Sequence, residues 1–173
     1  EIASCLVGSE MCIRDRAELV RTRLSSAGLG VPAVDAQTVI LMRSRTYMNE
    51  SGIAVSKVAS FAGITPDHLI VVHDEIDLDP GRLRLKKGGG DNGHNGLKSI
   101  RAHLRTGDFI RVRLGVGRPP GHQDPADWVL ARVPARQRAE MGVQVALAAD
   151  AVESIIIQAV SYTHLTLPTI LLV

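Results

Sequence analysis

The densest polar chemistry in the sequence follows a short apolar run, Leu69–Val72. A continuous apolar run of this length predicts a strand buried on both faces of a sheet. Asp74 and Glu75 follow at its carboxyl end, where open α/β sheets place their ligand crevices. Carboxylates in such a position suit acid–base chemistry, although Asp74 alone is equally compatible with a residue that caps a turn.

A glycine-rich segment comes next. Five of the nine residues at positions 88–96 are glycine, and Asp91, Asn92, His94 and Asn95 lie between them. So much glycine costs backbone entropy and indicates positive φ angles or close backbone approach. The segment lacks the GxxxxGK[ST] pattern, so it is not a nucleotide-binding P-loop. Its N–H groups and the helix start that follows are suited to hold an anion.

Four potential metal ligands also cluster here: His73, Asp74, Glu75 and Asp77. Adjacent residues of a strand point to opposite faces, so His73 and Asp74 are poorly placed to share one ion. The two cysteines, Cys5 and Cys12, form neither a disulfide framework nor a zinc pattern. The sequence therefore predicts no metal site.

Strands are predicted on both sides of this stretch. Residues 17–25 and 38–43 are apolar enough for sheet pairing, and a loop with glycine and proline joins them. After a turn at residues 79–81, a strand places Arg82, Arg84 and Lys86 on one face. Residues 109–117 alternate again, and we expect Ile110, Val112 and Leu114 to point inward and the arginines outward: Arg111 and Arg113. These two strands predict a basic floor.

Three segments predict helices by apolar residues at helical spacing. The first is expected to have Ser51 as its N-cap and to end at Gly63. The second covers residues 94–105 and is expected to stop at Gly107. The third covers residues 135–158, with an apolar stripe formed by Met141, Val145, Ala148, Val152 and Ile155.

Strands and helices alternate over a length of 173 residues without internal repeats or a linker. The sequence therefore predicts a single α/β domain, in which a mixed β-sheet is sandwiched between α-helices in three layers. No signal peptide and no apolar run long enough to span a membrane is evident, so we expect a cytoplasmic protein.

Charge is distributed unevenly, although the formal net charge is only +2. Positions 82–118 contain ten Lys or Arg against two Asp, whereas positions 67–79 contain five acids and no Lys or Arg. A basic strip beside an acidic pocket is expected when a polyanion is held next to a general base. An ordinary solvated surface is the alternative.

Three strings, in this order, resemble the bacterial peptidyl-tRNA hydrolase family: TYMNESG at 46–52, HDEIDLDPGRLRLKKGGG at 73–90 and GHNGLKSI at 93–100. The resemblance extends from about Ala17 to about Ile157. The family usually has glycine where this chain has Asn92, and asparagine tolerates the left-handed backbone better than other residues. The resemblance implies a monomeric hydrolase without cofactor, acting in translation, that binds peptidyl-tRNA and cleaves the ester between peptide and tRNA.

The resemblance also assigns catalytic roles. Asp74 matches the family's aspartate, which orients the catalytic histidine and stabilises its charged form. His94 matches a pocket histidine that is structural or orients the ligand. The family's general base lies in an amino-terminal stretch with GLGNPG-like and TRHN-like strings, and neither string occurs here. We therefore expect this chain to be an inactive fragment that lacks the catalytic histidine.

Other matched positions concern substrate binding. Asn49 and Asn95 match residues that contact the substrate near the scissile ester, and Asn95 is also expected to be catalytic. Tyr47 and Met48 match positions lining the same groove. Three basic positions match residues implicated in gripping tRNA phosphates: Arg84, Lys86 and Arg113.

Both ends of the chain differ in character from the rest. Residues 1–16 and 160–173 resemble translated adapter or vector sequence, so we expect the hydrolase-like domain to cover 17–159. The alternative function is a non-catalytic RNA-binding protein of the same fold. Retention of Asp74, Asn49 and Asn95 favours the hydrolase, because a binding protein has little need for an aspartate that serves a histidine.

Overall fold

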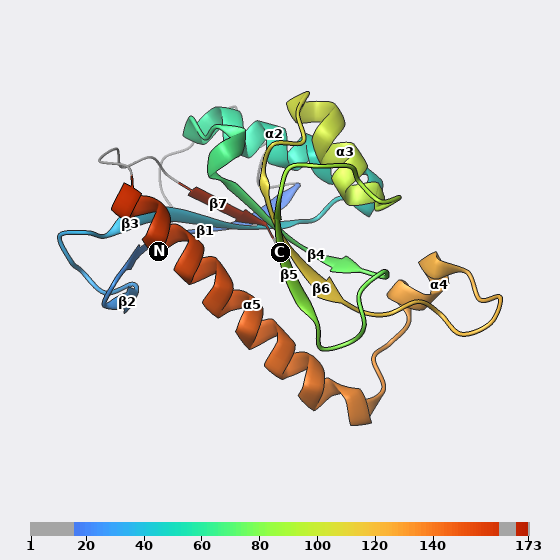
Figure 1. The fold of residues 1–173 in the computed structure, drawn as a ribbon. Coiled ribbons are helices and arrows are strands. Elements are labelled where there is room, and N and C mark those ends of the chain that lie inside the picture. The colour runs from blue at the N-terminus through green and yellow to red at the C-terminus, as the bar shows by residue number, and fades with distance from the viewer. Residues whose placement is uncertain (1–15, 163–168, 173) are drawn as a thin grey trace.

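The computed structural model describes residues 16–162 and 169–172 (Figure 1). Within these residues, seven strands form one mixed sheet in the order β2-β1-β3-β7-β4-β6-β5. Strand β7 is parallel to β3 and β4, and β4 is parallel to β6, whereas the other pairs are antiparallel. The strands are β1 (Ala17–Ser25), β2 (Gly28–Leu29), β3 (Gln37–Ser44), β4 (Leu69–Glu75), β5 (Leu83–Lys87), β6 (Ile110–Gly115) and β7 (Thr169–Leu172).

Helices flank the sheet on two sides. Figure 1 shows α2 and α3 together on one side, while the long α5 crosses the other. The prediction of a single mixed α/β domain is confirmed. The helices are α2 (Ser51–Ala62), α3 (Asn95–Leu104), α4 (Pro125–Leu130) and α5 (Ala135–Tyr162), with short 3-10 turns at η1 (Met48–Glu50) and η2 (Pro66–His68). None of the helices in the described part of the chain is long and apolar enough to cross a membrane.

Strand β4 has apolar partners on both faces. Leu69 and Val71 belong to the core cluster formed with α2 and α3, whereas Ile70 belongs to the cluster formed with α5. All three side chains are at most 4% exposed. Alternate burial against two helical layers explains why this strand is a continuous apolar run.

Helices α2 and α3 cross at Gly52. Its backbone N–H donates to Ser99 Oγ at 3.0 Å, and a Cβ at Gly52 would lie 2.2 Å from the carbonyl oxygen of Ser99. No side chain fits such a gap without moving backbone. The start of α2 is thereby fixed against the middle of α3.

The predicted N-cap of α2 and the predicted stop of α3 at Gly107 were wrong, although the predicted bounds of α3, 94–105, agree to within one residue with Asn95–Leu104. Ser51 is the first residue of α2 and not its cap; Glu50 precedes the helix, without a side-chain capping bond. Ser51 is 8% exposed and its hydroxyl faces Met48 Sδ at 4.0 Å, so packing and not capping sets its position. Helix α3 ends at Arg105, which has a left-handed φ of 56°, before Gly107. Gly63 does end α2, with φ 66°, as expected.

The prediction that Arg111 and Arg113 are exposed on a basic floor was also wrong. Arg111 is 2% exposed and the Arg113 side chain 14% exposed, because the glycine loop and α3 cover this face of β6. On α5, Ala148 and Val152 are buried as predicted, but Val145 is 54% exposed. The buried stripe follows residues spaced by four: Gln144, Ala148, Val152 and Ile156.

The terminal segments are only partly described. Residues 1–15 of the amino-terminal segment lie outside the described residues, as do 163–168 and 173 of the other. Helix α5 continues to Tyr162, and residues 169–172 form β7 in the middle of the sheet. The origin of both segments stays a prediction.

Candidate active site

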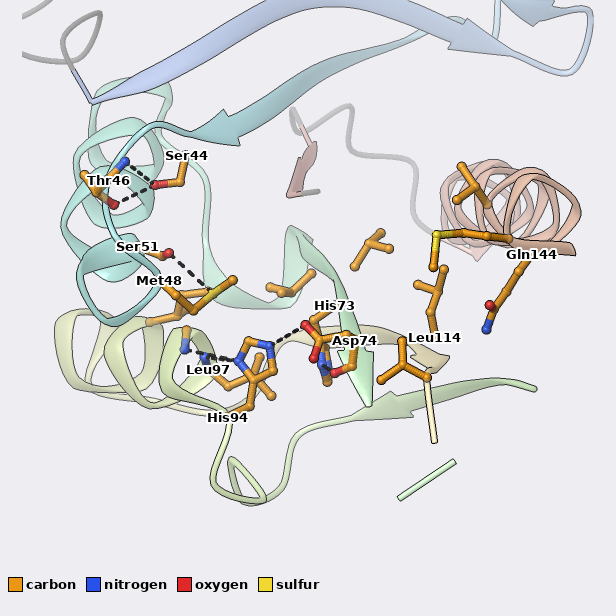
Figure 2. Close-up of a pocket in the computed structure, with 17 residues that line it drawn as sticks. Ser44, Thr46, Met48, Ser51, His73, Asp74, His94, Leu97, Leu114 and Gln144 are labelled. Carbon is orange, nitrogen blue, oxygen red and sulfur yellow. Dashed lines mark hydrogen bonds and ion pairs between the residues drawn. The ribbon is translucent and has the colours of Figure 1, made fainter. Parts of the chain in front are cut away.

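A pocket of about 370 Å³ opens where the end of β4, the start of α3, η1 and α5 meet (Figure 2). Asp74 and His73 come from β4, His94 precedes α3, and Met48 belongs to η1. Apolar side chains make up most of the remaining wall, among them Leu97, Ile100, Leu114 and Val145. A small polar group in a mostly apolar cavity is the usual composition of a ligand site.

Asp74 and His94 form a hydrogen-bonded pair in this pocket. His94 Nδ1 accepts from the backbone N–H groups of Gly96, at 3.1 Å, and Leu97, at 3.2 Å. His94 Nε2 therefore carries the proton and donates it to Asp74 Oδ1 at 3.1 Å. The bond from His94 is the main reason why the pKa of Asp74 lies below its usual value. The imidazole thus caps α3 and holds an ionised carboxylate with its other nitrogen.

The imidazole of His73 is also hydrogen-bonded to Asp74, through the backbone oxygen of that residue. Its Nδ1 lies 2.6 Å from the backbone oxygen of Asp74, so Nδ1–H donates and Nε2 is a bare acceptor. Nε2 is buried and has no hydrogen-bond partner among the described residues. Burial is the main cause that lowers the pKa of His73 to about 4, and the ring meets His94 edge-on at 5.0 Å. Asp74 therefore orients two neutral-state imidazoles, one through its carboxylate and one through its backbone.

Glu75 points to a different partner. Its Oε2 accepts from Arg113 Nε at 3.0 Å and from Nη2 at 2.7 Å, and the side chain is 5% exposed. Burial raises the pKa of Glu75, but the bonds from Arg113 and Asp77 N–H outweigh it, and the pKa is lowered overall. Asn92, with the expected left-handed φ of 48°, reaches the same oxygen at 3.5 Å. Arg113 is engaged in a buried ion pair.

Arg111 fastens the glycine loop from beneath. Its guanidinium donates to the carbonyl oxygens of Gly90, Gly89 at 2.8 Å and Gly107 at 3.4 Å, and it lies 4.7 Å from the centre of the Phe109 ring. These carbonyls come from both sides of α3. In a trans peptide the N–H points away from the C=O. The N–H groups of Gly90 and Asp91 therefore face away from Arg111.

The structure brings together some of the predicted site residues. Asp74, His94 and Met48 line the pocket. Asn95 is the exposed first residue of α3, next to His94, and Asn49 is exposed within η1. Tyr47 is 82% exposed and does not line the pocket. Two of the predicted phosphate ligands are exposed on β5: Arg84 and Lys86.

Sequence reasoning missed Gln144. This side chain is 5% exposed, and its Nε2 donates to the carbonyl oxygens of Arg82, at 3.1 Å, and Gly115, at 3.0 Å. It joins α5 to the ends of β5 and β6 beside the pocket. Its signal was a single polar residue on the α5 face that otherwise buries apolar side chains. No group of three metal-ligating side chains occurs among the residues that the structure describes.

Comparison with known proteins connects this geometry to one family. Residues 7–167 match the sequence model of the family described as "Peptidyl-tRNA hydrolase". The peptidyl-tRNA hydrolase of Nocardia farcinica is 51% identical over 129 residues, 75% of this chain and 67% of that protein. That of Mycolicibacterium smegmatis is 52% identical over 70% of this chain and 63% of its own length. That of Kineococcus radiotolerans is 44% identical over 91% and 78%.

Solved structures agree with the sequence relatives. The crystal structure of peptidyl-tRNA hydrolase from Acinetobacter baumannii superimposes with a TM-score of 0.66 and 28% identity, covering 87% of this chain and 76% of that one. A peptidyl-tRNA hydrolase in complex with N-propanol gives a TM-score of 0.64 and 29% identity, over 85% and 73%. The chain belongs to the peptidyl-tRNA hydrolase family.

Proposed function

We propose that this fold and pocket serve hydrolysis of the ester that joins a peptide to tRNA, and that turnover needs a general base which residues 1–173 do not supply. The observation that carries this proposal is Asp74, an ionised carboxylate at the end of β4 that holds an imidazole inside the pocket. A carboxylate in this place stabilises the imidazolium that forms when a histidine takes a proton from water. Family membership supplies the substrate class. A cytoplasmic monomer that needs no cofactor remains the accompanying prediction.

The neighbouring residues have proposed roles in binding. The apolar wall formed by Met48, Leu97 and Leu114 suits a peptide side chain or the face of a base. The exposed amides of Asn49 and Asn95 are suited to donate to a carbonyl near the ester. Tyr47 offers an exposed ring beside them, and the cations on β5 are suited to hold phosphates.

The general base of the proposed reaction is not assigned to a residue of this chain. Both nitrogens of His94 are engaged, and Nε2 of His73 is shielded from solvent. Among the described residues, neither imidazole attached to Asp74 therefore offers an accessible lone pair to a water molecule. This observation favours a second candidate function for residues 1–173, namely RNA binding without turnover.

The decisive experiment measures release of peptide from peptidyl-tRNA. It compares residues 1–173 with a chimeric protein whose first sixteen residues are replaced by a family-like segment with GLGNPG and TRHN strings and whose carboxyl end is family-like. We expect turnover only in the chimera. In the chimera, Asp74→Asn should reduce kcat by about 10²- to 10⁴-fold, with a much smaller change in KM.

Asp79→Asn is the matched control, because this aspartate lies exposed in the β4–β5 turn. Robust turnover by residues 1–173 would place the base within this chain and reject the binding-only candidate. Normal turnover in the Asp74→Asn chimera would remove the carboxylate from the mechanism.

A further inference from the structure

A second depression lies outside the pocket, on the other side of the glycine loop. It is open to solvent, has a volume of about 400 Å³ and shares no lining residue with the pocket. Its wall consists of the carboxyl-terminal half of α3, the turn after it and one residue of the glycine loop: Asp91, Lys98, Arg101, Ala102, Arg105, Thr106 and Gly107. We call it the α3 depression.

The α3 depression is positively charged. Lys98, Arg101 and Arg105 are spaced by three and four residues, which brings them to one side of a helix. The left-handed turn at Arg105 ends the helix there. Asp91 is the one carboxylate of its wall, and neither Lys98 nor Arg105 has a carboxylate partner among the described residues. Three cations against one anion leave an excess of two positive charges.

A buried charge adds to this excess. Arg111 lies behind the wall, where it donates to the carbonyl oxygen of Gly107 at 3.4 Å. It has no carboxylate hydrogen-bonded to it among the described residues, and its direct contacts are the three carbonyl oxygens and the face of the Phe109 ring. A buried charge acts through low-dielectric protein and is screened less by salt than a surface charge.

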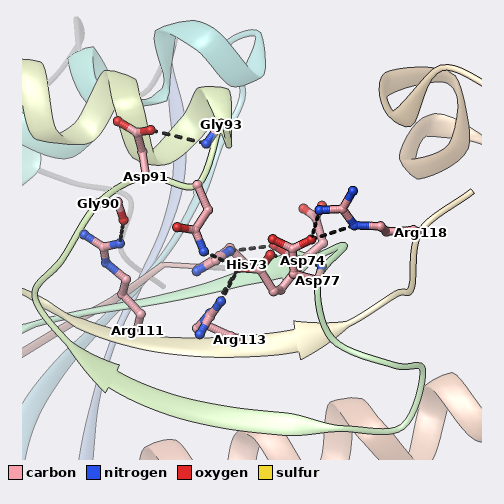
Figure 3. Close-up of polar contacts among 11 residues, drawn as sticks. His73, Asp74, Asp77, Gly90, Asp91, Gly93, Arg111, Arg113 and Arg118 are labelled. Carbon is pink, nitrogen blue, oxygen red and sulfur yellow. Dashed lines mark hydrogen bonds and ion pairs between the residues drawn. The ribbon is translucent and has the colours of Figure 1, made fainter.

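The depression is continuous with the cations of β5. A Cβ at Gly107 would lie 3.1 Å from the carbonyl oxygen of Gly89 and 3.3 Å from Arg101 Cδ, and one at Gly89 would lie 2.8 Å from Lys86 Nζ. Lys86 and Arg101 therefore approach the same backbone contact from two sides. Figure 3 shows Asp91 and Gly90 in this loop, with Arg111 below Gly90. Successive phosphates of one nucleic-acid strand are a few ångströms apart, so one strand can follow such a series of charges.

We propose that the α3 depression binds the phosphodiester backbone of the RNA. This inference rests on the proposed function for the identity of the RNA and adds a contact surface away from the pocket. The partner is recognised by charge, without contact to bases, so affinity depends strongly on salt and weakly on sequence.

Asp91 regulates access to this surface. Its Oδ2 pairs with Arg101 Nη1 at 3.3 Å, and its Oδ1 accepts from Gly93 N–H at 3.3 Å. A phosphate at Arg101 has to compete with this carboxylate. An asparagine at position 91 would keep an oxygen for the Gly93 bond and remove the competing charge. Asp91→Asn should therefore strengthen RNA binding, which is the opposite of the effect of removing a cation.

The experiment measures the Kd of full-length variants for uncharged tRNA by fluorescence anisotropy, between about 50 and 200 mM salt. The double variant Arg101→Gln/Arg105→Gln should lower affinity about tenfold or more at the lowest salt and reduce the log–log salt slope by about two. Asp91→Asn should tighten binding about two- to fivefold. The matched control is Arg132→Gln/Arg136→Gln, which removes two exposed charges before and at the start of α5.

An unchanged slope in the Arg101/Arg105 variant, or an equal loss in the Arg132/Arg136 variant, would overturn the proposal. Unchanged or weaker binding by Asp91→Asn would reject the competition by Asp91. Hydrolysis of a peptidyl ester of adenosine, which carries no phosphate, is measured in parallel on the chimera and on its Arg101/Arg105 variant. Loss of RNA binding with intact hydrolysis of this ester supports the depression, whereas RNA binding without hydrolysis rejects only the proposed function.

Discussion

Strands β5 and β6 are antiparallel neighbours with the same alternation of cations, and the structure uses the two sets differently. Arg84 lies opposite Arg113, and Lys86 opposite Arg111, on one face of the sheet. The β5 pair is exposed at the edge of the sheet. On β6, Arg111 is buried under the glycine loop and the Arg113 side chain is only 14% exposed. The same alternating basic pattern thus leaves exposed cations on the edge strand, for which we propose phosphate binding, and covered cations that bond to other parts of the protein on the next strand.

The largest expected effect concerns Arg111. Arg111→Met should lower the free energy of unfolding by about 4 kcal/mol, because three loop carbonyls lose a buried donor. Lys86→Met removes the exposed cation opposite and should change stability by less than about 0.5 kcal/mol. Chemical denaturation of both variants checks the contrast. Similar losses in the two variants would show that burial does not distinguish the strands.

The next effect concerns how stability changes with pH, and it involves His73, a buried neighbour of the β6 arginines. His73 on β4 lies opposite Arg113 on β6. Burial lowers the pKa of His73 from the usual value of 6.5 for a histidine side chain to about 4 in the folded protein. The unfolded chain binds a proton first, so stability should fall as pH drops from about 6.5 to about 4, by about 3 kcal/mol in total. Below that window the lowered pKa of Asp74 adds a separate loss.

His73→Asn should flatten the stability curve between pH 6.5 and 4, and the exposed His122→Asn should leave it unchanged. Urea unfolding at a series of pH values provides the measurement. A slope that persists in His73→Asn would assign the acid sensitivity to another group.

The smallest effect concerns phosphate binding by three of these four cations. Arg84→Gln and Lys86→Gln should each reduce the salt slope for tRNA binding by about one unit. Arg113→Gln should change it by clearly less, because Glu75 already neutralises that guanidinium. Anisotropy titrations at several salt concentrations separate the three variants. An equal slope change for Arg113→Gln would mean that Arg113 leaves Glu75 and binds phosphate; phosphate binding by Arg113 is what the family resemblance implies.

Much of the fold could be predicted from local patterns. Strand β1 has the predicted bounds, and α2 ends at Gly63, because alternation and a left-handed glycine are properties of the segment itself. The burial of Arg111 could not be predicted, since alternation defines two faces but not which one a distant loop covers. Strand β7 was not expected, because its partners are set by long-range pairing.

The candidate site was predicted to a similar extent. The motif positions of Asp74 and His94 predicted that both residues lie at a pocket, and both line the pocket described above. Their catalytic and binding roles stay predictions. The bond between them, and the sharing of Asp74 by two imidazoles, depends on the approach of α3 to β4. That approach is set by helix packing at Gly52, far away in sequence. Spacing in one motif carries no information about it.

The central position of β7 has a consequence for folding. Ile40 of β3 pairs with Ile170, and Ile70 of β4 pairs with Leu171, so each ladder closes a loop of about a hundred residues or more. During synthesis, β3 and β4 leave the ribosome before β7, the strand that separates them in the sheet. The edges of β3 and β4 that will pair with β7 therefore stay unpaired until β7 has been synthesised. High contact order of this kind slows folding, and refolding rates should respond more to substitutions at this seam than to those in the β1–β3 ladder.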